Sequence, residues 1–148
     1  MDNYGISAAG CVILNEKREV LLLRQTYDGC KWSLPGGRID TGEAAWEAAA
    51  RESSEEIGLT VDQLQLSGMY YLPHRHAYYY VFIAGSWSGI PVPDGDEIDR
   101  YGFFALDKLP GPITNFNIER IQDALEYTGH ARLRDQNNTR RQLINGKL

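Results

Sequence analysis

GGRIDTGEAAWEAAARESSEEIGL, residues 36–59, joins a short glycine loop to a predicted helix that is rich in acidic residues. Glu52, Glu55 and Glu56 are spaced i, i+3 and i+4, so on a helix they share one face within a single turn. An acidic helix face of this kind is often simply solvated. Three carboxylates this close repel each other, however, and carboxylate oxygens are the ligands that Mg²⁺ and Mn²⁺ prefer. The pattern therefore favours a bound divalent cation.

The spacing of glycine, glutamate and arginine in this stretch gives it a family resemblance. From Gly37, five residues lead to Glu43, seven more lead to Arg51, and the run Arg-Glu-x-x-Glu-Glu-x-Gly-Leu follows. This spacing resembles the Nudix box, and the chain is similar to the Nudix (MutT-like) hydrolases. The resemblance implies an α+β fold in which a mixed β-sheet lies between α-helices. Ser53 departs from the pattern, because the family has an aliphatic residue there, and we expect different local packing at this position.

The same resemblance implies a reaction and a cofactor. Nudix hydrolases cleave a pyrophosphate bond in a nucleoside diphosphate linked to another group, and they use Mg²⁺ or Mn²⁺. By this resemblance Glu52, Glu55 and Glu56 would hold the metal, and a backbone carbonyl at Gly36 or Gly37 would complete its shell. A metal can neutralise the diphosphate and activate water, which is the chemistry such a bond requires.

The other catalytic candidates are an arginine and a general base. Arg51 is expected to pair with Glu43 and to orient the acids, although a plain surface ion pair is the simpler alternative. The base could be Glu55 or Glu52 within the box. It could also be Glu97, which precedes a predicted strand where the family often carries an acid.

Four further residues are candidate substrate contacts: Arg24, Trp32, Arg75 and Tyr78. The two aromatic rings could stack on a nucleobase, although aromatic residues in strands more often pack in the core. Arg75 lies between two histidines at a predicted hairpin tip, where it would contact phosphate or ribose or remain solvated.

The rest of the chain predicts strands before and after the box and a second helix near the end. We expect strands over 4–14, 20–24, 32–34, 64–72, 77–87 and 100–106, and a helix over 117–127. In the first helix, we expect Asp40 and Glu43 to form the N-terminal cap and Gly58 to end it. Its buried stripe should contain Trp46, Ala49, Ser53 and Ile57.

Length and charge indicate one domain with an unevenly charged surface. The 148 residues suit a single domain over 1–148, and the formal net charge is −5. Residues 129–148 carry five basic residues and one acid, a net of +4, so the remainder carries −9. We expect this end to be a polar, basic tail that keeps the protein soluble or touches RNA.

The composition also bears on compartment. The sequence has no apolar run of 18 or more residues, which predicts that nothing spans a membrane. The N-terminal residues lack the basic region of a signal peptide. Cys11 and Cys30 follow no metal or disulfide pattern, which indicates free thiols in a reducing, cytoplasmic environment.

Several alternatives stay open at this point. The substrate could be of the ADP-ribose or nucleotide-sugar type, or a (deoxy)nucleoside triphosphate. The 5′ end of an RNA is a less expected alternative, because a nucleic-acid substrate is not favoured. A nucleotide-binding module on the same fold without catalysis is the rival from another class. A homodimer is also open, because dimers are the commonest oligomers.

Overall fold

The larger sheet of the computed structural model, which describes residues 4–146, is mixed and has the strand order β4-β1-β6-β5-β9. Its strands are β4 (Gly36–Arg38), β1 (Ala8–Val12), β6 (Ala77–Ser88), β5 (Thr60–Leu72) and β9 (Arg132–Asp135). β1 runs parallel to β6 and β9 runs parallel to β5, whereas the β1–β4 and β5–β6 pairs are antiparallel. The prediction of a mixed sheet is confirmed.

Two smaller sheets complete the framework. One has the order β3-β2-β7, and the other pairs β10 with β8, all antiparallel. Their strands are β3 (Trp32–Ser33), β2 (Val20–Gln25), β7 (Ile98–Phe104), β8 (Ile113–Thr114) and β10 (Leu143–Ile144). The backbone of Leu21 donates to the carbonyl of Ile13 at 2.9 Å, which ties β2 to the end of β1.

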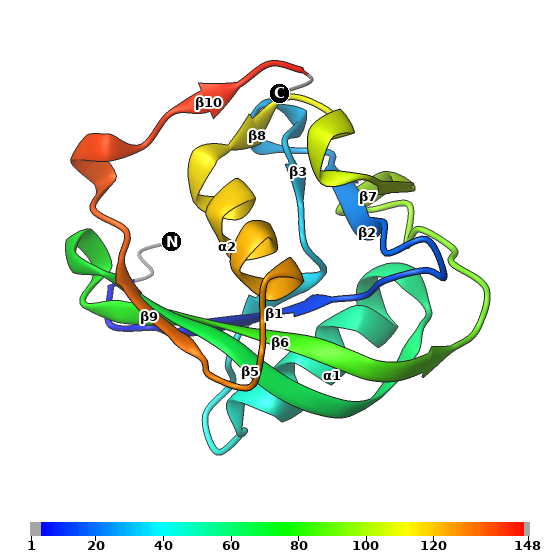
Figure 1. Ribbon diagram of the computed structural model, residues 1–148, viewed down its shortest axis with the longest axis horizontal. Helices are drawn as coiled ribbons and strands as arrows, with labels where there is room; N and C mark the ends of the chain where they lie inside the picture. The colour runs from blue at the N-terminus through cyan, green and yellow to red at the C-terminus, as the bar shows by residue number, and fades with distance from the viewer. Residues whose placement is uncertain (1–3, 147–148) are drawn as a thin grey trace.

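The two helices lie on opposite faces of this framework (Figure 1), α1 spanning Ala45–Ile57 and α2 spanning Asn115–Leu125. Alternation along β1 explains the arrangement, because successive side chains of a strand point to opposite faces. Cys11 belongs to the apolar cluster that contains the inner face of α1, and its neighbour Val12 belongs to the cluster that contains α2. The α/β/α architecture predicted from the resemblance is confirmed. Within residues 4–146 no helix is both long and apolar enough to cross a membrane.

The ends of α1 are set by local backbone chemistry. The backbone N–H of Ala44 donates to the Glu47 carboxylate at 2.8 Å, and Gly58 ends the helix with a left-handed φ of 75°. The predicted cap at Asp40 was wrong in position. Its backbone N–H does donate to Glu43 at 3.0 Å, but both residues belong to the turn before the helix.

The inner face of α1 differs from the predicted stripe at one residue. Ala49, Ser53 and Ile57 are buried as expected, but Trp46 is 60% exposed. Trp46 stands in the first turn, where the helix reaches the rim of the sheet, and its side chain borders an open groove instead of entering the core. Ser53 is fully buried, and its hydroxyl donates to the carbonyl of Ala49 at 2.9 Å, so the polar group is satisfied within the helix.

The C-terminal segment, which was predicted to be a polar basic tail over 129–148, contributes the strands β9 and β10 within the described residues. Figure 1 shows β9 lying beside β5 and the chain then passing around the side of α2 to β10. Gln136 is fully buried, and Arg134 donates to Asp123 of α2 at 2.7 and 2.8 Å. Part of the basic character of this segment therefore serves internal ion pairing. Lys147 lies outside the described residues.

The remaining element boundaries differ from the predictions by a few residues. β1 is shorter than the predicted 4–14, and β5 begins four residues before the predicted start. α2 begins two residues early, because the hydroxyl of Thr114 accepts the backbone N–H of Asn117 at 3.2 Å and so caps the helix. Cys11 is buried and Cys30 is exposed, and both are free.

Candidate functional site

An acidic cleft of about 560 Å³ lies where the glycine loop, α1 and the loop before β7 meet. It contains every residue that the sequence predicts for catalysis or metal binding. Its lining residues are Tyr27, Gly36, Gly37, Arg38, Asp40, Arg51, Glu52, Glu55, Glu56, Asp94 and Glu97. Five of these come from α1 or the turn before it, and all five are acidic or basic members of the stretch over 36–59.

The three glutamates of α1 occupy graded depths in this cleft. The Glu55 side chain is 58% exposed and that of Glu52 is 15% exposed, whereas Glu56 is buried. Helical spacing agrees with this order, because Glu56 follows the buried Ser53 by three residues and so lies on the same side of the helix. The cleft thus presents carboxylate oxygens from its floor to its rim.

Glu56 forms the floor of the cleft. One of its oxygens accepts the backbone N–H of Gly36 at 2.9 Å. Burial, together with the neighbouring carboxylates of Glu52, Glu97 and Asp94, raises the pKa of Glu56 to about 8, against the opposing effect of the Gly36 N–H. Burial also raises the pKa of Glu52. A cation in the cleft would favour the ionised form of both groups.

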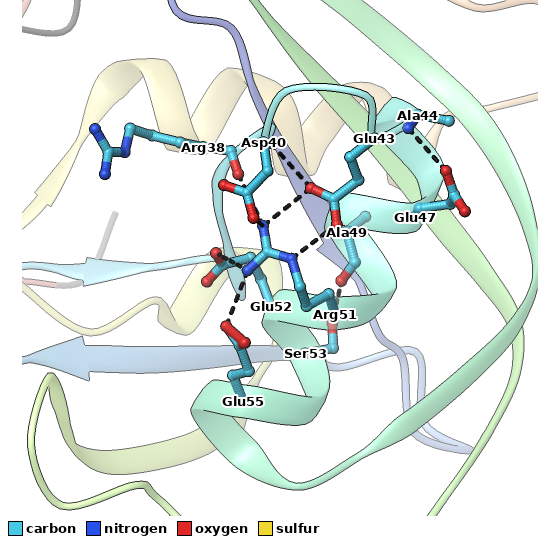
Figure 2. A network of polar contacts seen from close by, with 10 residues as sticks. All are labelled: Arg38, Asp40, Glu43, Ala44, Glu47, Ala49, Arg51, Glu52, Ser53 and Glu55. Carbon is cyan, nitrogen blue, oxygen red and sulfur yellow. Dashed lines mark hydrogen bonds and ion pairs between the residues drawn. The ribbon is translucent and has the colours of Figure 1, made fainter.

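Arg51 hydrogen-bonds to several side chains at the cleft entrance (Figure 2). Its Nε and Nη2 donate to the two oxygens of Glu43 at 2.8 and 3.1 Å, and Nη1 donates to Glu52 and Glu55, both at 2.9 Å. Nη2 also donates to the carbonyl of Arg38 at 3.0 Å. The hydrogen bonds of Arg51 lower the pKa of Glu43. The predicted Arg51–Glu43 pair is present, and it joins the loop to the helix.

Neighbouring atoms leave no room for a Cβ at either Gly36 or Gly37. A Cβ on Gly37 would lie 2.6–2.9 Å from the carboxylate group of Glu52. A Cβ on Gly36 would lie 2.5 Å from the carbonyl oxygen of Ala9 and 2.7 Å from the Cα of Gly10. Gly37 therefore makes room for a functional side chain, and Gly36 makes room for the neighbouring strand.

The opposite wall of the cleft is the loop that leads into β7. The Asp94 carboxylate accepts the backbone N–H groups of Asp96, Glu97 and Ile98 at 2.9, 3.1 and 2.9 Å, which fixes the loop. The backbone N–H of Asp94 donates to the carbonyl of Glu56 at 3.1 Å. Glu97, the predicted later acid, is thereby held across the cleft from the α1 glutamates.

The four candidate substrate residues lie elsewhere. Arg24 of β2 donates to Asp99 of β7, in a pair whose Nε–Oδ1 distance is 3.0 Å, and Trp32 packs edge-on against Phe104. The ring of Tyr78 is stacked on one neighbouring tyrosine of the larger sheet and tilted against another. Arg75 lines a second pocket, on the α2 side of the larger sheet. The structure does not bring these four residues into the acidic cleft.

The predicted metal ligands lie near each other without being preassembled. Within residues 4–146 no three acidic, histidine or cysteine side chains converge as a ready metal site. Figure 2 shows that the guanidinium of Arg51 is hydrogen-bonded to both Glu52 and Glu55. Tyr27 and Asp94, which also line the cleft, were not predicted as site residues. Asp94 does lie in an acidic run before β7, but only the folded loop shows which of those acids faces α1.

Comparison with known proteins agrees with this geometry. The family model described as the NUDIX domain matches residues 6–124. The chain is 34% identical over 99 residues to a putative 8-oxo-dGTP diphosphatase of Bacillus subtilis, covering 67% of this chain and 66% of that protein. It is also 34% identical over 105 residues to an ADP-ribose pyrophosphatase of Methanocaldococcus jannaschii, covering 66% of this chain and 61% of that protein.

Solved structures show the same architecture. A MutT NUDIX hydrolase from Burkholderia pseudomallei superposes with a TM-score of 0.72 at 27% identity, covering 80% of this chain and 97% of that one. The chain spans 38% to 66% of the length of the first curated relatives that it matches.

Proposed function

The chain belongs to the Nudix family, and we propose that it is a divalent-metal-dependent hydrolase that cleaves the pyrophosphate bond of a nucleoside diphosphate linked to another group. The observation that supports this proposal is the acidic cleft of about 560 Å³, which is lined by three glutamates of one helical turn and by Glu97. Two phosphate groups and their counter-ions require a polar cavity of this kind.

The donor set of the cleft suits Mg²⁺ or Mn²⁺. The oxygens are those of Glu52, Glu55 and Glu56, which are hard ligands, and Gly36 belongs to the same lining. Glu56 is buried without an arginine or lysine partner among the described residues, so a cation would supply the missing countercharge. When bound, such a metal neutralises the diphosphate oxygens and lowers the pKa of a bound water.

Arg51 is a positioning residue in this proposal. Its two hydrogen bonds to Glu43 anchor the guanidinium, whereas Glu52 and Glu55 each hold it through Nη1 alone. These two glutamates can therefore turn toward a metal while the Glu43 pair stays intact. Arg51 thus keeps the acids of α1 ready at the cleft entrance.

The general base is either a glutamate of the Nudix box or Glu97. Glu55 is the most exposed of the three glutamates, so it is free to accept a proton from water. Glu97 lies on the opposite wall, on a loop that Asp94 fixes. Comparison of the pH profiles of Glu55→Gln and Glu97→Gln turnover would separate them, because loss of the base removes the acidic limb of the profile.

The substrate is proposed to be a small nucleotide. We favour a small nucleotide over RNA because part of the basic C-terminal segment is paired internally, Arg134 with Asp123 at 2.7 Å and Arg132 with Glu126 at 3.8 Å. Relatives named for 8-oxo-dGTP and for ADP-ribose keep both the triphosphate and the ADP-ribose classes open.

A turnover panel tests the proposal. It should offer ADP-ribose, nucleotide sugars, dinucleoside polyphosphates, (deoxy)nucleoside triphosphates and triphosphorylated RNA, each with Mg²⁺ or Mn²⁺ and with neither. We expect metal-dependent release of a nucleoside monophosphate from a small nucleotide. Tight binding of ADP-ribose without turnover under any metal would favour the non-catalytic module instead.

A further inference from the structure

An apolar groove of about 450 Å³ lies between the first turns of α1 and the strands β5 and β6. Its apolar members besides Trp46 are Ala50, Val61, Leu64 and Phe82. Val61 and Phe82 belong to the cluster that contains the inner face of α1, so the groove is an open edge of the core. The groove shares no lining residue with the acidic cleft.

Trp46 stands at this groove without a role in building the fold. It is 60% exposed, the largest exposed fraction of any phenylalanine, tyrosine or tryptophan within residues 4–146. Its indole N–H has no hydrogen-bond partner among those residues, whereas the indole N–H of Trp87 donates to the carbonyl of Leu14 at 2.9 Å. Exposed tryptophans beside apolar surface are typical of binding sites, because the ring offers a large contact area and a polar N–H.

The strand side of the groove is shaped by an irregularity in β5. Val61 and Leu64 both pack with the α1 cluster, although strict alternation would send residues three apart to opposite faces. Gln63 lies between them with a left-handed φ of 53°, which breaks the alternation. Gly85 of β6 leaves room for it, since a Cβ there would lie 2.8 Å from the Gln63 carbonyl oxygen. The irregularity therefore places both apolar side chains in the groove.

Two exposed carboxylates, those of Glu47 and Asp62, are the charged groups of the groove, and no arginine or lysine lines it. The ion pairs found for residues 4–146 all involve other acids. One oxygen of Glu47 accepts the backbone N–H of Ala44 at 2.8 Å, and Figure 2 shows that Glu47 takes no part in the network of Arg51. The groove thus combines an apolar surface with two negative charges that the fold does not neutralise.

Charge complementarity identifies the kind of partner that fits. A second copy placed on the same groove across a two-fold axis would bring two carboxylates of each copy together, and like charges in contact oppose association. An entirely apolar partner would remove both carboxylates from water without a counter-ion. A cationic side chain with an aliphatic stem avoids both costs, because its stem covers apolar surface while its charged end meets the acids.

We infer that this groove is a docking site for a basic segment of another protein, in which an arginine stacks on Trp46 and pairs with Glu47 or Asp62. Arginine suits the groove better than lysine, because a planar guanidinium stacks on an indole and binds a carboxylate through its edge. An aliphatic residue next to that arginine would pack on Leu64 and Phe82. The inference is independent of hydrolysis in the acidic cleft.

An NMR titration of the ¹⁵N-labelled protein at low salt tests the inference. The indole N–H signal of Trp46 is the reporter, and it is identified by its loss from the spectrum of Trp46→Gln. The probe is the peptide Leu-Arg-Leu-Arg-Leu, blocked at both ends, and its counterparts have lysine, glutamine or glutamate in place of arginine.

Two double variants separate the groove from the general negative charge of the protein. Glu47→Gln/Asp62→Asn removes both charges of the groove at nearly constant size, and glutamine keeps an acceptor for the Ala44 N–H. Glu16→Gln/Asp107→Asn is the control, because it removes the same charge from exposed positions outside the groove and the acidic cleft. Thermal unfolding of each variant shows that it is folded before it is titrated.

The expected result is a saturable shift of the Trp46 signal with the arginine peptide, a weaker effect of the lysine peptide, and none with the glutamine or glutamate peptide. Glu47→Gln/Asp62→Asn should weaken binding about tenfold, since each exposed ion pair contributes a few-fold. Trp46→Gln, followed through backbone signals of the groove, should weaken it about fivefold, as loss of an exposed cation–π contact implies. The control should bind as the natural chain does.

Three results would overturn the inference. The first is no saturable shift with the arginine peptide, and the second is equal affinity of the natural chain and Glu47→Gln/Asp62→Asn. The third is a Trp46 signal that moves with protein concentration alone, because the groove would then be covered by a second copy. A protein that fails to hydrolyse any nucleotide but binds the arginine peptide would refute the proposed function and leave this docking site standing.

Discussion

The adjacent glycines Gly36 and Gly37 should respond very differently to the same added methyl group. At Gly37 the methyl meets only the carboxylate of Glu52, which is the far end of a flexible side chain. At Gly36 it meets the carbonyl of Ala9 and the Cα of Gly10, which are backbone atoms of β1. Gly37→Ala should therefore displace one functional group, and Gly36→Ala should force two strands apart.

The magnitudes follow from the contacts that each methyl disturbs. Displacing Glu52 weakens its 2.9 Å hydrogen bond to Arg51. A charge-assisted bond of this kind contributes about 1.5–3 kcal/mol, and partial exposure reduces it, so Gly37→Ala should cost about 1–2 kcal/mol. Overpacking against backbone costs about 1–3 kcal/mol or more, and two contacts below 3 Å put Gly36→Ala at about 3 kcal/mol or above.

Urea unfolding at equilibrium, without divalent cations, measures both costs. Turnover with metal supplies the second readout, because moving Glu52 by about 1 Å should lower the rate roughly a hundredfold while the protein stays folded. The reasoning is refuted if Gly36→Ala is no less stable than the natural chain. It is equally refuted if Gly37→Ala keeps full activity.

Three further predictions concern the framework. Asp123→Ala should lower the free energy of unfolding by about 3 kcal/mol in urea titration. It removes the hydrogen-bond partner of the Arg134 guanidinium and of the Tyr70 hydroxyl, which donates to Asp123 at 2.7 Å. A loss below about 1 kcal/mol would contradict this pairing. Deleting residues 131–148 should abolish the cooperative thermal transition, since it removes β9 from the sheet; an unchanged melting temperature would restore the view of this segment as a tail. Trp46→Gln should change stability by less than about 1 kcal/mol, as its 60% exposure implies, and a larger loss would mean that this side chain is a core residue after all.

The acidic cleft was largely predictable because its key contacts are local in sequence. Glu52, Glu55 and Glu56 share a helical turn whatever the rest of the fold does, and Arg51 pairs with Glu43, which stands only eight residues earlier in the chain. Helical spacing and the box motif together carry this information. The burial of Glu56 was harder to predict from the sequence, because it depends on the segment that brings the backbone nitrogen of Gly36 within 2.9 Å of the Glu56 carboxylate.

The long-range contacts are the ones that the sequence predicted least well. Arg120 is one polar residue in an apolar helical stripe, and nothing local indicates that Gln136 and Tyr79 enclose it. The pairing of β9 with β5 is hidden for the same reason, since a short strand with two arginines has weak local signals. Trp46 shows the converse error, because helical spacing alone does not tell where the sheet beneath the helix ends.

The most direct test of the central claim is the metal-dependent hydrolysis rate of Glu56→Gln on the best substrate of the panel. Glutamine keeps an acceptor for the Gly36 N–H, so the variant should fold with an unchanged urea midpoint or a higher one. Glu16→Gln, an exposed change away from the cleft, is the control. The account predicts at least about a hundredfold loss of Mg²⁺-dependent turnover in Glu56→Gln alone, since even groups that only support a metal ligand are worth 10–100-fold. Full activity in folded Glu56→Gln would contradict it.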